Sequence, residues 1–257
     1  MTEIHPTAIV SPKAKIGNNV KIDPYVIIHD DVVIGDDCKI GPHTVIYDGA
    51  RIGNRVKFAQ SVSVSNRPQD LKFKDEKTYF QIGDDTDVRE FVTLHRASID
   101  GASSRVGKNC LLMAYVHIAH DCIVGDNVVI ANASQLGGHV EIEDWVVVGG
   151  LSPIHQFVKV GQHSMIGGGF KATQDIPPYV KAASHPIRYS GINSVGLRRR
   201  GFSNEEIFNI KKAYQLLYKS KLNISQAKAK VAVEFAGNPH VEIILEFFSK
   251  STRGGFN

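Results

Sequence analysis

An aliphatic residue recurs at every sixth position over most of this chain, and this period constrains the fold more than any other feature. The first series runs from Ile4 to Val64 without a miss, through Val10, Ile16, Ile22, Ile28, Ile34, Ile40, Ile46, Ile52 and Phe58. The period returns at Ile82, Val88 and Leu94, and then runs at the same spacing from Val106 to Ile166. Neither the 3.6-residue period of a helix nor the simple alternation of a strand fits a strict period of six.

Short strands joined by tight turns do satisfy this period. The aliphatic residue would point inward with a small or β-branched partner four positions later, and parallel strands would stack coil upon coil about 4.8 Å apart. The pattern resembles the hexapeptide-repeat, left-handed parallel β-helix family, in which three hexads make one triangular coil of 18 residues. The resemblance covers roughly residues 1 to 180, or about ten coils. We therefore expect a mainly β fold, a left-handed parallel β-helix, followed by an α-helical C-terminal domain over residues 181–257.

The cysteines fit this register, because Cys38, Cys110 and Cys122 all fall on the small inward position. They are most simply core residues in a reducing compartment. The N-terminal stretch lacks a basic segment followed by an apolar core, and no apolar run approaches the roughly 18 residues of a membrane span. We expect a cytoplasmic protein without an integral membrane segment.

The period breaks at two places. In residues 65–81, Asp70 and Glu76 stand where aliphatic residues belong, so this segment is expected to leave the column as a loop. A long charged loop in so regular a fold suggests a function, and a tolerated insertion is the alternative. The register also slips over residues 97–105, where we expect a small bulge rather than a site.

Helical patterns replace the period after Pro177 and Pro178. Ser203 and Glu206 form a capping box before a first helix, Ser225 is expected to open a second helix that ends near Ala236, and Pro239 to open a third. Residues 181–257 contain 13 Lys and Arg against 5 Asp and Glu, a net charge of +8. Such a surface could meet phosphates, lipid, nucleic acid or an acidic protein. Nucleic acid is disfavoured because aromatic residues are not interleaved with the charges.

Stacking residues 18 apart turns the sequence into columns and brings several polar residues together. His120 lies under Gly138 and then Gln156, and Asp121 lies under His139, all outside the inward slots. An imidazole beside an approachable backbone N–H offers a general base and an oxyanion donor, which together suit acyl transfer. A solvated histidine is the simpler reading, and a zinc site made by His117, His120 and His139 is a second alternative.

Several motifs narrow the resemblance. They are "HIAHDC" (117–122), "LGGHV" (136–140), "IHQF" (154–157), "QDIPPYV" (174–180), "QDLKF" (69–73), "GLRRRGFS" (196–203) and "STRG" (251–254). Together they resemble the UDP-N-acetylglucosamine O-acyltransferase family of lipid A biosynthesis over the whole chain. The resemblance implies transfer of a (3R)-3-hydroxyacyl chain from acyl carrier protein to the sugar 3-hydroxyl by a homotrimer with active sites between subunits. It implies no metal and no organic cofactor, and it gives the basic tail an acidic partner in the carrier protein. A basic surface that is only solvated remains the alternative.

The resemblance also assigns roles by position. His120 matches the general base, Asp121 the residue that orients it, and Gly138 the oxyanion donor. Residues matching substrate-binding positions are Gln69, Asp70, Lys72, His95, His117, His139, His155, Gln156, Asn193, Arg199 and Arg200, the last of which could instead face the carrier protein. Val195 stands where the family's best-known enzyme carries a glutamate in the nucleotide-binding segment. Gly168 matches the position that gauges acyl length, and its small size points to a long hydroxyacyl chain.

Three rival functions stay open. A related N-acyltransferase acting on an amino sugar nucleotide would carry an extra N-terminal domain, whereas the hexads here begin at Ile4. A zinc-dependent hydratase would contain metal on analysis of the purified protein. A non-catalytic scaffold would show no acylation that depends on carrier protein.

Overall fold

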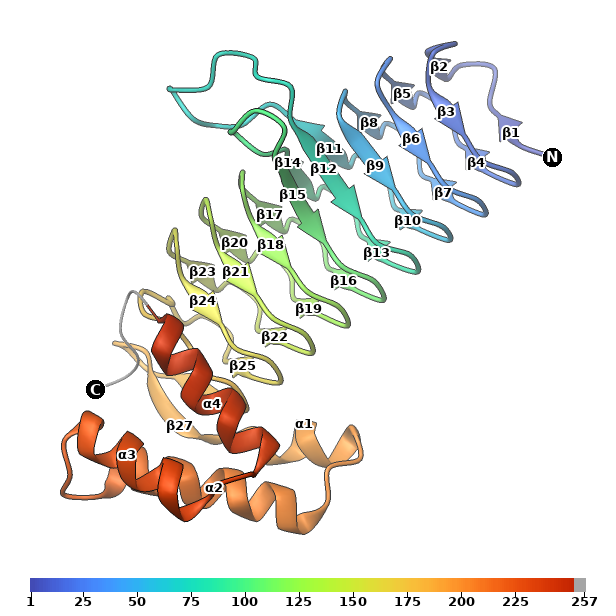
Figure 1. Ribbon diagram of the computed structural model, residues 1–257. Coiled ribbons are helices and arrows are strands. Elements are labelled where there is room, and N and C mark those ends of the chain that lie inside the picture. Colours follow the sequence, from blue (N-terminus) through green and yellow to red (C-terminus); the bar gives the residue numbers. More distant parts are fainter. Residues whose placement is uncertain (252–257) are drawn as a thin grey trace.

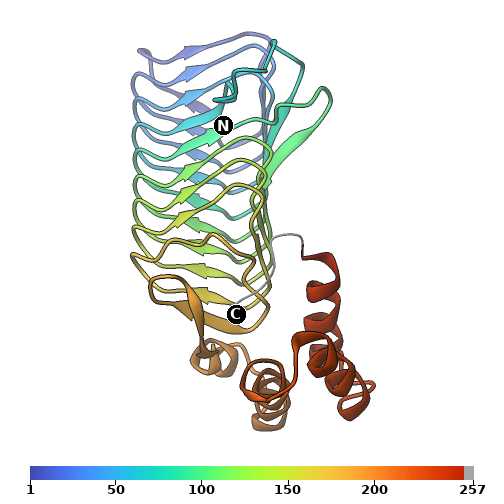
Figure 2. The same cartoon turned by 90° about the vertical axis from the view of Figure 1, so that its left-hand side faces the viewer.

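A computed structural model describes residues 1–251 of the chain, so Thr252, Arg253 and Gly254 of the "STRG" motif lie outside the described residues. Figure 1 shows a long column of stacked triangular coils that ends against a group of helices. Figure 2, turned by 90°, shows the coils stacked one upon another along the whole column. This architecture is the parallel β-helix that the six-residue period predicts.

Three sheets form the faces of the column, and successive hexads contribute one short strand to each face in turn. Sheet A contains β1 (Glu3–Ile4), β4 (Lys21–Ile22), β7 (Lys39–Ile40), β10 (Lys57–Phe58), β13 (Asp87–Val88), β16 (Leu111–Leu112), β19 (Val129–Ile130), β22 (Val147–Val148), β25 (Met165–Ile166), β26 (Val180–Ala183) and β27 (Arg188–Ile192). Sheet B contains β2 (Ile9–Val10), β5 (Ile27–Ile28), β8 (Val45–Ile46), β11 (Ser63–Asn66), β14 (Thr93–His95), β17 (His117–Ile118), β20 (Gln135–Leu136) and β23 (Pro153–Ile154). Sheet C contains β3 (Lys15–Ile16), β6 (Val33–Ile34), β9 (Ala50–Ile52), β12 (Tyr79–Ile82), β15 (Ser103–Val106), β18 (Ile123–Val124), β21 (Glu141–Ile142) and β24 (Lys159–Val160).

The pairing register explains the sequence period. In the regular coils, strands pair in parallel with the strand 18 residues away, as Ile118 does with Leu136, so each aliphatic slot lies above the previous one. These slots are buried from Ile22 onward, whereas Ile4 is 49% exposed because the first coil has no coil beyond it. Cys38, Cys110 and Cys122 are buried as predicted, and burial raises the pKa of the Cys122 thiol to about 12.

Each turn between two faces of the column has two positions that favour particular residues. The residue after the aliphatic slot is often glycine because the next coil passes close by: a Cβ at Gly35 would lie 2.7 Å from the carbonyl oxygen of Gly53. The residue two positions later takes the left-handed conformation, for example Asp37, Asp121 and His139 with φ of 59°, 60° and 60°. Asn, Asp and His tolerate this conformation better than most residues do.

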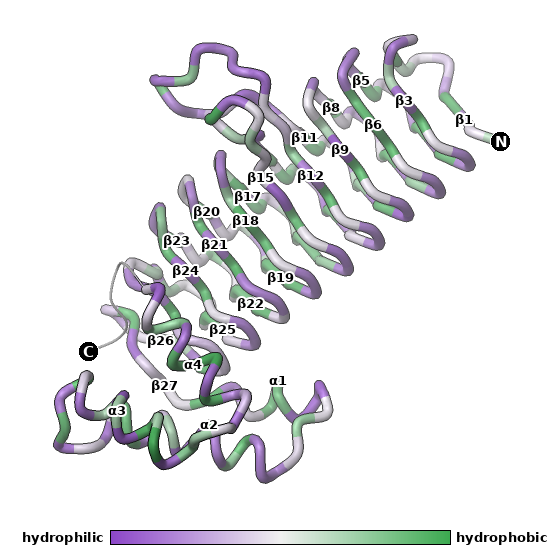
Figure 3. The backbone as a smooth tube through the Cα atoms, viewed as in Figure 1, coloured by the Kyte–Doolittle hydropathy of each residue, from purple (hydrophilic) through white to green (hydrophobic). Residues whose placement is uncertain are grey.

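Both interruptions of the period leave the column at one corner, between sheets B and C. The first joins β11 to β12 and the second joins β14 to β15, and Figures 1 and 2 show the two loops side by side. The first loop is shorter than the predicted 65–81, because β11 extends to Asn66 and β12 begins at Tyr79, with Phe80 fully buried. Figure 3 colours this loop largely hydrophilic.

The C-terminal part differs in several details from its prediction. It contains α1 (Ser194–Arg199), α2 (Asn204–Lys219), α3 (Ile224–Glu234) and α4 (Pro239–Lys250), but residues 181–192 are largely strand, so an all-helical domain over 181–257 is wrong. The Ser203–Glu206 capping box and the start at Pro239 are confirmed. The second predicted helix is capped by Asn223 rather than opened by Ser225, and it ends at Glu234 rather than near Ala236. Among residues 1–251, no helix combines the length and apolar character that crossing a bilayer requires.

Candidate active site

The candidate site lies at the corner between sheets B and C, in turns of consecutive coils. His120 and Asp121 follow β17, Gly138 and His139 follow β20, and Gln156 follows β23. The His139 N–H donates to the His120 carbonyl at 3.1 Å, and the Phe157 N–H donates to the Gly138 carbonyl at 3.0 Å. The predicted column of His120, Gly138 and Gln156 is therefore present in the structure.

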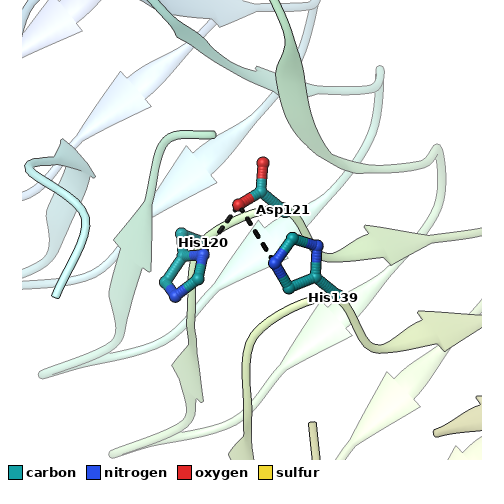
Figure 4. Close-up of side chains that lie close together, drawn as sticks. All are labelled: His120, Asp121 and His139. Carbon is teal, nitrogen blue, oxygen red and sulfur yellow. Dashed lines mark hydrogen bonds and ion pairs between the residues drawn. The ribbon is translucent and has the colours of Figure 1, made fainter. Parts of the chain in front are cut away.

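His120 and Asp121 form a hydrogen-bonded pair (Figure 4). The Nδ1 atom of His120 lies 2.7 Å from Oδ2 of Asp121, which assigns the proton to Nδ1 and leaves Nε2 free to accept one. Their side chains are only 15% and 9% exposed, so the interaction is weakly screened. The hydrogen bond to Asp121 raises the pKa of His120, and the negative charge of Asp70 also raises it. Burial lowers this pKa, but by less. Burial acts to raise the pKa of Asp121, but the hydrogen bonds from His120 and Ser98 outweigh it and hold that pKa at about 2.

The His120 imidazole occupies the space that a side chain at Gly138 would fill. A Cβ at this position would lie 2.8 Å from Cε1 and 2.9 Å from Nε2 of His120, so the side chain of any other residue would displace the ring. Gly138 is buried, and no group within residues 1–251 accepts its N–H. A backbone donor without a protein acceptor has its hydrogen-bonding capacity open to water or a ligand.

At the corner between sheets C and A, the N–H of the corresponding turn position is capped. There, a carboxylate or amide one coil further on accepts the N–H, as Asp36 does for Asn18 at 2.6 Å and Asp144 does for Asp126 at 2.8 Å. At the site, the corresponding residues are Gly138 and Gln156, and within the described chain neither caps the N–H one coil earlier. Among residues 1–251, the Gly138 N–H thus lacks the cap found at the C–A corner, as does the same turn position at the A–B corner, for example in Ala114 and Asn132.

Ser98 was not predicted as a site residue, because it lies in the segment expected to be only a bulge. The Ser98 N–H donates to Oδ1 of Asp121 at 3.0 Å, and its hydroxyl donates to Oδ2 at 2.6 Å. Ser104 accepts the Asp121 N–H at 2.8 Å. The available signal was the position of the slip, because residues 96–102 stand at the same hexad boundary as His120.

Two other histidines of this corner, His95 and His117, have pKa shifts opposite in direction to that of His120. Burial lowers the pKa of His117 to about 4 and also lowers the pKa of His95. The Thr93 hydroxyl lies 2.8 Å from Nδ1 of His117, and Nδ1 of His95 lies 2.6 Å from the Arg67 carbonyl oxygen. His139 stacks on Phe157 and meets His120 edge to face, with ring centres 5.3 Å apart. Two of these rings are thus held neutral, and His120 is the one whose pKa is raised.

The two outer groups of predicted substrate residues border the same corner. Gln69 and Lys72 are exposed on the first loop, and Asp70 accepts the Lys72 N–H at 2.9 Å. His155 and Gln156 lie one coil further along the column, with Nδ1 of His155 3.2 Å from the Gln156 carbonyl oxygen.

Four predicted residues lie elsewhere in the chain. Asn193 is the buried N-cap of α1, Arg199 and Arg200 line a cavity of about 350 Å³ on the face of sheet A, and Val195 lines it too. The Arg200 guanidinium also lies over Trp145 and donates to Nδ1 of His163 at 3.2 Å. Gly168 stands at the corner between sheets A and B. Within a single chain, the structure does not bring these residues to His120.

One grouping in the described chain has the side chains that a metal ion requires. A nitrogen of His120, a nitrogen of His139 and a carboxylate oxygen of Asp121 lie within 4.8 Å of one another. The Asp121 carboxylate already accepts hydrogen bonds from His120 and from both donors of Ser98.

Comparisons with known proteins show which family the chain is similar to. A family model described as "Udp N-acetylglucosamine O-acyltransferase; Domain 2" matches residues 175–256, and the bacterial transferase hexapeptide model matches residues 13–48, 31–66 and 103–136. An acyl-[acyl-carrier-protein]–UDP-N-acetylglucosamine O-acyltransferase of Myxococcus xanthus is 45% identical over 255 residues, 99% of each chain. One of the same description from Thiobacillus denitrificans is 42% identical, again over 99% of each.

Solved structures give the same result. The crystal structure of a UDP-N-acetylglucosamine acyltransferase from Bacteroides fragilis matches with a TM-score of 0.95 and 44% identity, covering 99% of this chain and 100% of that one. The corresponding protein from Campylobacter jejuni matches with a TM-score of 0.92 and 35% identity, covering 98% of both chains.

Proposed function

The chain belongs to the UDP-N-acetylglucosamine O-acyltransferase family, and from that membership we propose that it transfers a (3R)-3-hydroxyacyl chain from acyl carrier protein to the 3-hydroxyl of UDP-N-acetylglucosamine. It is an acyltransferase of the lipid A pathway. The observation that carries the chemical mechanism is the packing of the His120 imidazole, with Nε2 free, against a glycine whose N–H has no acceptor in the described chain.

The mechanism follows from the positions of these groups. Nε2 of His120 takes the proton of the sugar 3-hydroxyl as that oxygen forms a bond with the thioester carbon. The carbonyl oxygen becomes an oxyanion and accepts a hydrogen bond from the Gly138 N–H. The tetrahedral intermediate then expels the carrier thiolate, which takes the proton back from His120. Asp121 holds the imidazole in one orientation and stabilises its protonated form through Nδ1.

The surrounding residues provide binding groups. Gln69, Asp70 and Lys72 on the loop and His95, His117, His139, His155 and Gln156 along the corner bind the sugar and the acyl-phosphopantetheine arm. Asn193, Arg199 and Arg200 bind the nucleotide, for which guanidinium groups suit a diphosphate. Gly168 limits the length of the acyl chain, and because glycine has no side chain it leaves room for a long one. The carrier protein, which is acidic, meets the basic C-terminal surface.

The nucleotide-binding residues lie far from His120 on one chain. A homotrimer would bring the two groups together, because a neighbouring subunit can supply the nucleotide-binding residues. The chain has an exposed apolar corner between sheets A and B that suits such contacts. Tyr25, Phe91, Tyr115 and Leu151 lie along it and are 57%, 42%, 58% and 70% exposed. Large apolar side chains gathered on one surface are typical of subunit contacts. We place the enzyme in the cytoplasm, where its three buried thiols stay reduced.

Replacing His120 tests the proposal. We expect His120→Ala to lower kcat by on the order of a hundredfold or more, since the general base is lost while the column remains folded. His5→Ala, at an exposed histidine of the first coil, is the matched control and should keep full activity. The assay is mass spectrometry of the product from UDP-N-acetylglucosamine and a set of hydroxyacyl carrier proteins. Near-normal turnover by a folded His120→Ala protein would refute the role of His120.

A further inference from the structure

Ser98 holds the carboxylate of Asp121 at both of its oxygens. The backbone N–H reaches Oδ1 at 3.0 Å and the hydroxyl reaches Oδ2 at 2.6 Å. Oδ2 is also the oxygen that accepts from Nδ1 of His120 at 2.7 Å. One oxygen therefore serves two donors, one from the second loop and one from the histidine.

Ser98 itself is fixed by its neighbours. The N–H of Ala97 donates to the Tyr79 carbonyl at 3.2 Å, and the N–H of Gly101 donates to the Lys77 carbonyl at 2.9 Å. The Lys77 N–H in turn donates to Oδ1 of Asp100 at 3.1 Å. The end of the first loop thus anchors the segment that carries Ser98, and Ser98 is not a freely rotating surface residue.

We propose that Ser98 is a positioning residue of the active site, which fixes the Asp121 carboxylate and shares Oδ2 with His120 so as to set the basicity of the imidazole. This rests on the proposed role of His120 as the general base. A carboxylate oxygen that accepts two hydrogen bonds gives up part of its charge to each donor, so it stabilises the imidazolium less than an unshared oxygen does.

The other titratable groups near His120 are one carboxylate and three histidines, and none of them is hydrogen-bonded to its ring in the described chain. They are Asp70 on the first loop, His95 and His117 on sheet B, and His139 on the next coil. Burial keeps His95 and His117 neutral near pH 7 by lowering their pKa values. Only Asp121 is hydrogen-bonded to the His120 ring within the described chain.

The sign of the effect follows from linkage. Neutral His120 is the base, so activity rises as the pH passes upward through its pKa. Ser98→Ala removes the hydroxyl that donates to Oδ2 but keeps the backbone N–H that donates to Oδ1. Oδ2 then keeps more of its negative charge for the hydrogen bond from His120, so the pKa of His120 rises further. We expect the ascending limb of the kcat/KM profile to move to higher pH by roughly half a unit or more. We expect kcat to fall about tenfold, the effect of one hydrogen bond to a charged group.

The experiment compares three variants of the full chain. Ser98→Thr keeps a hydroxyl and should restore both kcat and the limb. Ser103→Ala is the matched control, because the Ser103 hydroxyl accepts from Gln81 at 3.0 Å and does not touch Asp121. An NMR titration of the His120 ring, which needs no turnover, should show the same upward shift in Ser98→Ala.

The proposal would be overturned if a folded Ser98→Ala protein showed no upward shift in the ascending limb of its kcat/KM profile and none in the pKa of His120 measured by NMR, or if both moved to lower pH. Because the titration is independent of catalysis, its result stands even if His120→Ala shows that His120 is not the base.

Discussion

His120 and Gly138 act as one unit, because the imidazole occupies the space that a side chain at position 138 would fill. In the proposed mechanism, the same glycine supplies the N–H for the oxyanion. Two catalytic requirements, space for the base and access to a backbone donor, are thus met by one missing side chain.

A methyl group at this position should therefore impair catalysis. Gly138→Ala would place Cβ 2.8 Å from Cε1 of His120 and push the ring off its position, so we expect kcat to fall by on the order of a hundredfold with the column intact. Gly150→Ala is the control, since it occupies the same hexad position at another corner and its Cβ would meet nothing closer than the Asn132 carbonyl oxygen, at 3.2 Å. Steady-state kinetics and circular dichroism of both variants check this, and equal activity in the two would contradict it.

The sequence predicts the pair of residues 120 and 138 because a regular coil places residues 18 apart above one another. It could not predict Ser98, because the slip over residues 97–105 breaks that register, and contacts across a slip depend on the path of the loop. The raised pKa of His120 and the lowered pKa values of His95 and His117 also needed the structure, since burial sets their directions.

At the scale of elements, the local sequence predicts the N-cap of α2 correctly but does not decide which residue caps α3. Ser203 and Glu206 satisfy each other's backbone N–H groups, as the motif predicts. For α3, Asn223 and Gln226 form an equivalent box two residues before the predicted start. Both Asn223 and Ser225 are residues that favour N-caps, so the sequence alone does not distinguish them.

Alanine at each position should distinguish them in solution. Asn223→Ala removes the side chain that accepts the Gln226 N–H at 2.9 Å, and it should destabilise α3 by about 1 kcal/mol. Ser225→Ala, inside the first turn, should change the stability by less than about 0.5 kcal/mol. Native-state hydrogen exchange of the α3 amides measures both. A larger loss in Ser225→Ala would show that the helix starts at the later residue.

The two loops are a second case at this scale. The sequence indicates where each leaves the column, but not that they meet, because hydrogen bonds between Lys77 and residues 100–101 fix their arrangement. A break in the repeat therefore marked the functional corner, while the contacts that build it came from the structure.

At the scale of the whole molecule, the predicted site residues divide into two groups on one chain. His120 lies at the corner between sheets B and C, whereas Arg199 and Arg200 line a cavity on sheet A. No single sequence shows which surfaces of two copies meet. The family resemblance supplied the trimer as an expectation, and the separation of the two groups gives it a physical reason.

Mixing two inactive variants tests this arrangement. In a trimer whose sites combine His120 of one subunit with Arg199 of the next, His120→Ala and Arg199→Ala proteins unfolded, mixed equally and refolded should regain about a quarter of the sites. Each variant refolded alone provides the baseline. Activity that stays at the baseline while sedimentation shows mixed trimers would exclude a shared site.

The triangular winding also limits how such a chain can change in length during evolution. Gaining or losing 18 residues moves everything beyond that point along the column without turning it. Gaining six residues turns everything beyond that point by one face, so insertion between His120 and Gly138 would separate the base from its glycine. Viable changes in the regular part of this column should therefore come in whole revolutions, whereas the B–C corner, where the chain leaves the winding, accepts segments of any length.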